Sequence, residues 1–190
     1  MKNINHLLKE IIPPDDYQHR NGFSNENIIL SLSEVEKIEV EHNLIEMLKK
    51  KDDILIGETL AIMKSKNSLE ALKKRLESSK NSSSKIIWAS FINEIKGGDE
   101  EMKNIALTEF DNVTEKYTLI FIFHYLSNFN DSRINEKIRT YINHRDYLTA
   151  YNARTSIGID TKEIIERERE REREKGKGKG KSKWWQFWKN

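Results

Sequence analysis

The side chains that could carry chemistry are few and scattered. The chain has no Cys, which excludes thiol catalysis and thiolate metal sites. Its five His residues form no HExxH pair; they are His6, His19, His42, His124 and His144. Glu39 and His42 make a single ExxH spacing, whereas a carboxylate-bridged metal pair in a helical bundle needs a second copy on another helix. We therefore expect a solvated helix face at Glu39 and His42, and neither a metal nor a cofactor.

Other catalytic patterns are missing or have a structural explanation. There is no GxSxG, and Gly97-Gly98 is an isolated glycine pair rather than a phosphate-binding loop. Paired carboxylates such as Asp52-Asp53 stand where helices are expected to begin, and there they favour the positive end of the helix dipole. His124 lies in the apolar stretch 119–126, so we expect it to be buried and hydrogen-bonded.

The elements that would position a site repeat along the chain. Two apolar stripes separated by a short polar break recur three times, and Met63, Ile95 and Phe129 occupy matching positions at intervals of 32 and 34 residues. The stripes are Ile56, Leu60 and Met63 with Leu69, Leu72 and Leu76; Trp88, Ile92 and Ile95 with Met102, Ile105, Ala106 and Phe110; and Ile122, Leu126 and Phe129 with Ile134, Ile138 and Ile142. A shorter fourth copy spans 146–165. A single helical pair leaves its apolar stripe exposed to water, so successive pairs are expected to stack and bury it.

These units resemble HEAT-like repeats. The resemblance is carried by 58–63 (ETLAIM) followed by 69–76 (LEALKKRL), in which a Leu-rich second helix follows a tight turn, and it covers about residues 53–165. The turn proline and the Asp/Arg pair of many HEAT units are missing. The resemblance implies an all-α fold, a short α-solenoid of HEAT-like helical hairpins with a disordered C-terminal tail. A compact helical bundle is the alternative.

The sequence divides into four parts: a polar lead segment 1–30, a repeat domain 31–165, a low-complexity charged linker 166–183 and an aromatic terminal motif 184–190. Ser33 and Glu36 predict a capping box at the start of a helix whose apolar face includes Ile38. Glu and Arg alternate over 166–174, which makes i,i+3 pairs attractive and i,i+4 pairs repulsive, so this helix should be marginal. Lys and Gly alternate over 175–181 and predict a flexible linker.

The net charge of +2 conceals an asymmetry. Six of the 33 basic residues lie in 175–190, so residues 1–174 hold 27 basic and 31 acidic side chains, a formal charge of −4. A mildly acidic body makes nucleic acid an unlikely partner, because phosphate neutralisation supplies most of the affinity for DNA or RNA. Without a leader or a run of about 20 apolar residues, we expect a cytoplasmic protein.

The predicted surface of the repeat domain suggests protein binding more strongly than any residue pattern suggests catalysis. In solenoids the second helices of successive units usually line one curved face, here expected to be concave. Its polar positions, which we predict to bind a protein partner, are Lys73, Lys74, Glu77, Lys103, Asn104, Glu109, Asn135, Glu136 and Arg139. Mixed charge suits a complementary protein surface; an ordinary solvated surface is the alternative.

The aromatic tail allows three interpretations. Trp184, Trp185, Phe187 and Trp188 follow a run of Lys residues. Such a segment could make peripheral contact with an anionic membrane, or dock into a protein pocket as a short motif, or have no role.

Size, composition and the lone repeat domain also resemble, in style, the immunity proteins of bacterial polymorphic-toxin systems. That resemblance implies a non-enzymatic protein that neutralises a toxin, encoded by an adjacent gene, by covering its active site. One alternative is a HEAT-like nucleic-acid repair or lyase-type enzyme, with Trp88 and Asp99 or Glu100 forming an aromatic and acidic cleft. Another is a peripheral membrane adaptor anchored by the Lys/Trp tail.

Overall fold

The computed structural model describes residues 3–179, with side chains to residue 174, and this part of the chain is all helical. Its elements are α1 (Ile4–Ile11), α2 (Tyr17–Arg20), α3 (Glu26–Leu30), α4 (Glu34–Lys50), α5 (Ile54–Ile62), the 3-10 turn η1 (Lys66–Ser68), α6 (Leu69–Ser78), α7 (Ser82–Lys96), α8 (Glu100–Phe110), α9 (Lys116–Ser127), α10 (Ser132–Arg139), α11 (Tyr147–Ser156) and α12 (Lys162–Lys179). No strand occurs within these residues, so the all-α prediction is confirmed for them.

Helix boundaries follow the polar breaks of the sequence. The predicted capping box of Ser33 and Glu36 is present at the start of α4. Asp53, Asp99 and Asp131 each accept a backbone N–H at the start of α5, α8 and α10 respectively. Gly97 adopts a left-handed conformation, with φ of 69°, and ends α7. The breaks therefore act as caps, because their short polar side chains satisfy the free donors of each helix start.

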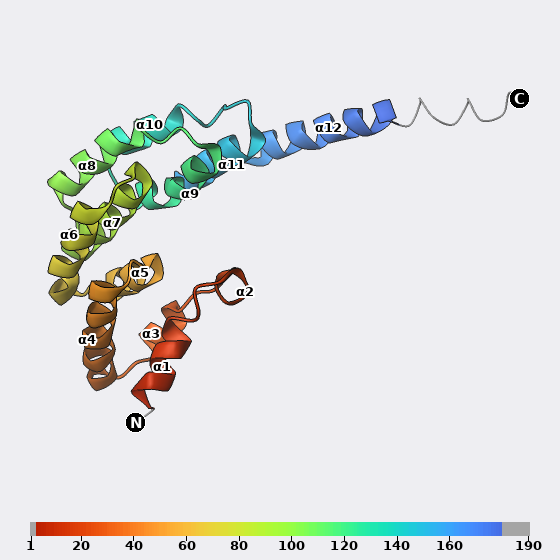
Figure 1. The fold of residues 1–190 in the computed structure, drawn as a ribbon. Helices are drawn as coiled ribbons and strands as arrows, with labels where there is room; N and C mark the ends of the chain where they lie inside the picture. The colour runs from red at the N-terminus through yellow and green to blue at the C-terminus, as the bar shows by residue number, and fades with distance from the viewer. Residues whose placement is uncertain (1–2, 180–190) are drawn as a thin grey trace, which may run out of the picture.

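The helices form an arc in Figure 1, with α12 extending from one end. In this view α4, α6, α8 and α10 follow the outer side of the arc, and α5, α7, α9 and α11 lie nearer its inner side. The N-terminal helices α1 and α3 pack on α4 and α5 at the other end.

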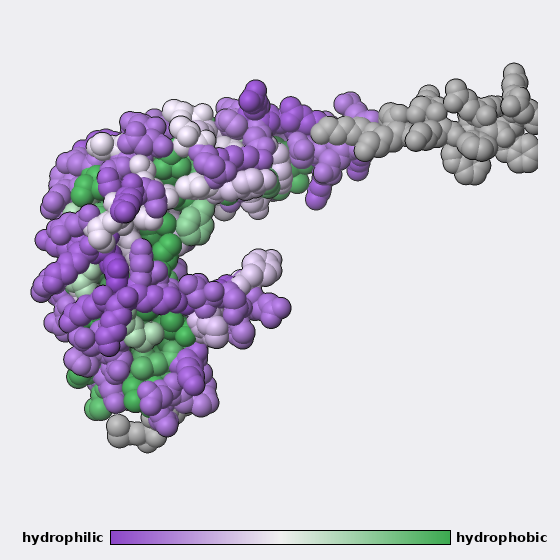
Figure 2. Space-filling model, in the orientation of Figure 1, coloured by the Kyte–Doolittle hydropathy of each residue, from purple (hydrophilic) through white to green (hydrophobic). Residues whose placement is uncertain are grey.

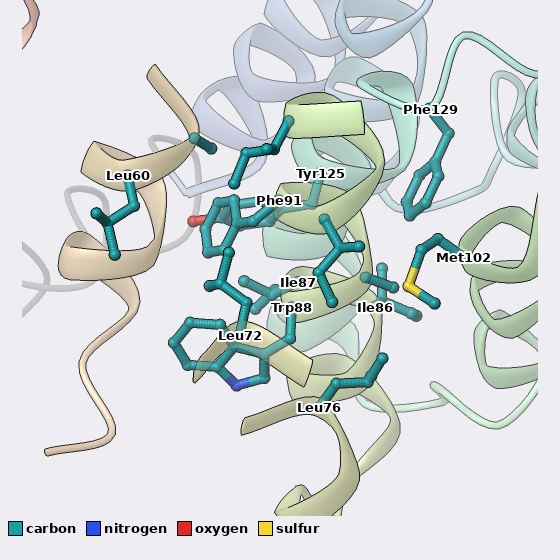
Figure 3. Packing of buried hydrophobic residues seen from close by; sticks show 14 of the residues in the cluster. Leu60, Leu72, Leu76, Ile86, Ile87, Trp88, Phe91, Met102, Tyr125 and Phe129 are labelled. Atoms are coloured by element: carbon teal, nitrogen blue, oxygen red, sulfur yellow. The ribbon is translucent and has the colours of Figure 1, made fainter. Parts of the chain in front are cut away.

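Helix α7 lies at the centre of the core. Its side chains are buried around the whole helix from Ile86 to Ile95, apart from Glu94, and it packs against α5, α6, α8 and α9. Figure 3 shows this packing, with Leu72 and Leu76 from α6, Met102 from α8 and Tyr125 from α9 around the side chains of α7. Between Ile86 and Ile95, α7 is covered by helices from both halves of the arc, so it ties these halves together.

The crossing of α5 over α7 depends on one glycine. A Cβ added to Gly57 would collide with the indole of Trp88 and would lie 2.8 Å from Cδ2 of Phe91. Trp88 is 1% exposed and makes an edge-to-face contact with Phe91. The two helices can therefore approach this closely only because residue 57 has no side chain.

Three features differ from the sequence-based expectations. The lead segment is not merely polar, because Leu7, Ile11 and Ile29 belong to the same buried cluster as the repeat helices. Ile38 of α4 does not lie on the buried face of that helix; its side chain is 69% exposed. Residues 166–179, expected as a marginal helix and then a flexible linker, continue α12 to Lys179.

The continuation of α12 has a local explanation. Glu and Arg are both strong helix formers, and the i,i+3 attraction is realised between Arg171 and Glu168, whose Nη1 and Oε2 lie 3.5 Å apart. The motif Trp184, Trp185, Phe187 and Trp188 lies outside the described residues. Within the described chain, no helix combines the length and the apolar character that crossing a membrane requires.

Candidate functional site

A hollow of about 340 Å³ opens on the inner side of the arc, where three distant parts of the sequence meet. The loop around α2 contributes Asp15, Arg20 and Phe23, the start of α5 contributes Asp52, Asp53, Ile54, Leu55 and Glu58, and α9 contributes Phe121. Figure 2 shows the indentation on this side of the molecule, between the polar lobe of α2 and the arm that carries α9. We call this site the inner hollow.

One wall of the inner hollow is fixed by a buried ion pair. Nη1 and Nη2 of Arg20 donate to the two carboxylate oxygens of Asp53 at 2.7 and 2.8 Å, and the Asp53 side chain is only 1% exposed. Arg20 also donates to the backbone carbonyls of Pro13 and Pro14. This guanidinium therefore holds the proline loop against the start of α5, since a bidentate pair fixes both distance and orientation.

The same carboxylate sets the charge of this wall. Burial works to raise the pKa of Asp53, but hydrogen bonds from Arg20 and Lys51 outweigh it and hold this pKa below its ordinary value. Lys51 lies 3.0 Å from Asp53 and 3.3 Å from Asp15, and Arg20 lies 3.1 Å from Asp15. Two cations and two carboxylates thus neutralise one another.

Two further carboxylates at the inner hollow have no such partner. In the described chain, no Lys, Arg or His forms an ion pair with Asp52 or Glu58. Glu58 is half-buried, and burial raises its pKa, with Glu94 adding to this and His124 opposing it. The inner hollow therefore keeps an excess of negative charge after its internal pairs are formed.

An aromatic wall faces these carboxylates. Phe121 is 49% exposed, and Tyr117, one turn earlier on α9, is 67% exposed. The ring of Phe121 rests against Tyr125, with centroids 5.3 Å apart, and Tyr125 packs in turn on Phe91 of the core. Burial raises the pKa of Tyr125, with the charge of Glu58 adding to it. The wall is therefore anchored in the core while one ring stays half exposed.

The predicted partner-binding row occupies a different place. Lys73, Lys74 and Glu77 lie on α6, Lys103, Asn104 and Glu109 on α8, and Asn135, Glu136 and Arg139 on α10. Figure 1 places these three helices on the outer side of the arc, opposite to the concave side that we expected. The reason is that α5, α7, α9 and α11, the first helices of each pair, take the inner side.

Part of this row nevertheless surrounds one groove. Lys73 and Glu77 of α6 and Glu109 of α8 line a groove of about 310 Å³, whose floor includes Leu76, Met102 and Ile105. Lys74 points elsewhere and pairs with Glu70 at 2.8 Å. Other members of the row form polar contacts outside the groove. Lys103 pairs with Asp131 at 3.9 Å, and Glu136 pairs with Arg139 at 3.6 Å. The side-chain oxygen of Asn104 accepts a hydrogen bond from Arg133. Asn135 lies on α10 without a role in the groove.

The proposed catalytic cleft does not form. Trp88 is buried in the core, Asp99 caps α8 and pairs with Lys96, and Glu100 pairs with Arg133 at 2.5 Å. The described residues contain no cluster of His and carboxylates that could hold a metal ion.

The expectation that His124 is buried is wrong. This side chain is exposed rather than buried, because its position on α9 faces the inner side near Glu58. The inner hollow was not predicted from the sequence, since Arg20 and Asp53 are 33 positions apart and no motif links them.

Comparisons with protein families, with characterised proteins and with solved structures find no match to this chain.

Proposed function

We propose that this chain is a non-enzymatic protein-binding module that recognises a basic surface of its partner with the inner side of its arc. The observation that carries the proposal is the inner hollow, where the half-exposed ring of Phe121 and two carboxylates without an ion-pair partner, Asp52 and Glu58, line the same space. Aromatic anchors supply much of the energy of protein interfaces, and complementary charge supplies rate and specificity.

The architecture supports a more specific form of this proposal. Between α5 and α11, α5, α7, α9 and α11 pack on one another in turn, and α6, α8 and α10 pack beside them with short connections, which supports a HEAT-like α-solenoid. The chain resembles immunity proteins of polymorphic-toxin systems in size and style. We therefore propose that the partner is a toxin encoded by an adjacent gene, that its active site is covered sterically, and that the acidic body steers a basic toxin towards the arc.

The experiment is a pull-down of the tagged full chain from its native host, followed by identification of the co-purified protein and expression of that protein alone. Recovery of a stoichiometric, toxic product of a neighbouring gene supports the proposal. Recovery of nucleic acid, or of no protein, contradicts it.

The binding surface is mapped with two matched double variants. The inner variant is E58K/F121A, and the outer variant is K73E/E77K, which reverses charge on the predicted row of α6. We expect the inner variant to weaken binding of the recovered partner by at least about 100-fold, which corresponds to roughly 2.8 kcal/mol, and the outer variant to bind as the wild type does. The reverse result would assign binding to the outer row instead.

A further inference from the structure

We propose that the inner hollow seats the guanidinium of one arginine side chain of the partner, with Asp52 and Glu58 as counter-charges and the ring of Phe121 as the wall on which it stacks. This inference rests on the proposed function and specifies the chemistry of its contact.

The carboxylates of Asp52 and Glu58 form no ion pair with a described Lys, Arg or His, although His124 lies near Glu58, so they leave room for an external cation. Arg20 and Lys51 are committed to Asp15 and Asp53 by contacts of 2.7 to 3.3 Å, so neither can turn towards Glu58 without breaking a pair. Glu58 is half-buried in the lining of the hollow, and burying an unpaired carboxylate is unfavourable. A cation delivered by a partner would supply the missing counter-charge.

The aromatic wall favours guanidinium over ammonium. Phe121 presents a half-exposed ring to the hollow that Asp52 and Glu58 also line, and its contact with Tyr125 holds that ring in place. A planar guanidinium can stack on an aromatic face and donate to carboxylates at its edge at the same time, whereas a hydrated ammonium cannot do both equally well.

The size and the rim of the hollow limit the occupant. A space of about 340 Å³ accepts a side chain but not a helix. Phe23, Ile54 and Leu55 supply apolar surface at its edge, on which the methylene stem of an arginine can lie. Every part of an arginine side chain therefore meets matching chemistry.

The test is an NMR titration of the ¹⁵N-labelled full chain with N-acetyl-arginine methylamide. The matched probes are N-acetyl-citrulline methylamide, which has the same shape without the charge, and N-acetyl-lysine methylamide. We expect saturable shifts confined to backbone amides of the inner hollow with the arginine probe, at least about fivefold weaker binding of the lysine probe, and no saturation with citrulline.

Three variants sharpen this result. Glu58→Gln and Phe121→Leu should each weaken arginine binding at least about fivefold. Glu77→Gln, which removes an exposed carboxylate on α6, should leave it unchanged. Equal binding of arginine and lysine, saturation by citrulline, or shifts spread over all acidic surfaces would each overturn the inference.

The two proposals fail separately. If the arginine probe does not bind, yet the inner variant E58K/F121A loses the partner in the pull-down, the inner face binds protein through another group and only the guanidinium assignment falls. If the probe binds and no protein partner is recovered, the guanidinium site stands and the proposed function falls.

Discussion

Asp53 joins three segments through one side chain. It caps α5 by accepting the N–H of Leu55, pairs with Arg20 of the α2 loop and pairs with Lys51 at the end of α4. A carboxylate that is 1% exposed is tolerated only with such partners. The stability of this wall of the inner hollow therefore depends on the contacts of Asp53 with Arg20 and Lys51.

Replacing Arg20 with Ala should lower the free energy of unfolding by about 3 kcal/mol, because the buried carboxylate of Asp53 loses its bidentate partner. Urea denaturation at pH 7 measures this. The control is Lys49→Ala, which removes an exposed pair with Glu46 and should cost less than about 0.5 kcal/mol. Similar losses for the two variants would contradict the role of Arg20.

The pH dependence of this effect has a definite sign. The pKa of Asp53 lies below its ordinary 3.8 in the folded chain, so the pair stabilises the fold above that pH and is lost as the pH falls through the folded pKa. The difference between wild type and Arg20→Ala should therefore shrink below about pH 3.8.

Glu58 should behave in the opposite way. Because burial raises its pKa, the folded chain binds the proton more tightly than the unfolded chain, and stability falls as the pH rises above 4.5. We expect Glu58→Gln to raise the urea midpoint at pH 7.5 and to change it little at pH 4. Glu70→Gln is the control, since Lys74 lowers the pKa of Glu70 and its removal gives no such gain. A lower midpoint for Glu58→Gln at pH 7.5 would contradict this account.

Local residue roles were predictable where neighbours in sequence define them. The capping box of Ser33 and Glu36 needs only a three-residue spacing, and it is present. Arg20 with Asp53, and Glu58 with Phe121, needed the tertiary fold, because the members of each pair lie 33 and 63 positions apart. His124 was misjudged because an apolar run on a helix does not bury every member, and the one polar residue took the exposed face.

At the scale of elements, the packing of α5 on α7 decides how close two repeats can come. An Ala at position 57 would favour the helix by about 1 kcal/mol, but its Cβ would meet Trp88 and Phe91. The steric effect should dominate, because the crowded atoms are rings held in a dense core.

We therefore expect Gly57→Ala to lower the free energy of unfolding by about 2 kcal/mol, as measured by urea denaturation. Combining it with Trp88→Phe should cost less than the sum of the two single changes, because the smaller ring removes the collision with residue 88 and leaves only the one with Phe91. A stabilised Gly57→Ala variant, or strictly additive losses, would show that helix propensity rather than contact governs this position.

The elements themselves were largely foreseeable. The breaks at 66–68, 97–99 and 130–132 all separate helices, since short polar residues and glycine mark helix ends. The side of the arc taken by each helix was not foreseeable, because both helices of a pair carry similar apolar stripes. The length of α12 was underestimated, since like-charge pairs weigh less here than the helix propensity of Glu and Arg.

At the scale of the whole molecule, α12 is an appendage to a self-sufficient core. Ile164 is the last buried residue among the described side chains of α12, and this helix packs on α11. Arg154 secures this junction by donating to the carbonyls of Ile142 and Asp160. Residues 166–174 therefore add charge and length rather than core.

Cutting the chain after Ile165 should leave the free energy of unfolding within about 0.5 kcal/mol of the full chain. The cut changes the formal charge from +2 to −3, because 23 basic and 26 acidic residues remain. Urea denaturation measures stability, and far-UV circular dichroism should show a loss of helix confined to the removed part. A cut at 160, which removes Ile164, is the destabilised comparison, and equal stability of the two truncations would contradict the boundary.

The central position of α7 also has a consequence during synthesis. A ribosome delivers the chain from the N-terminus, so α5 and α6 are ready when α7 is complete, whereas α8 and α9 are not. After α7 has left the exit tunnel, the ribosome must add a further stretch as long as residues 97–127 before α9 has also left it, which takes roughly 2 to 6 s at ordinary elongation rates. During that interval one flank of α7, which is buried on every side in the finished fold, faces water on the nascent chain. Newly made copies thus pass through a short window in which they are open to chaperones and to one another, and this window closes when α9 emerges.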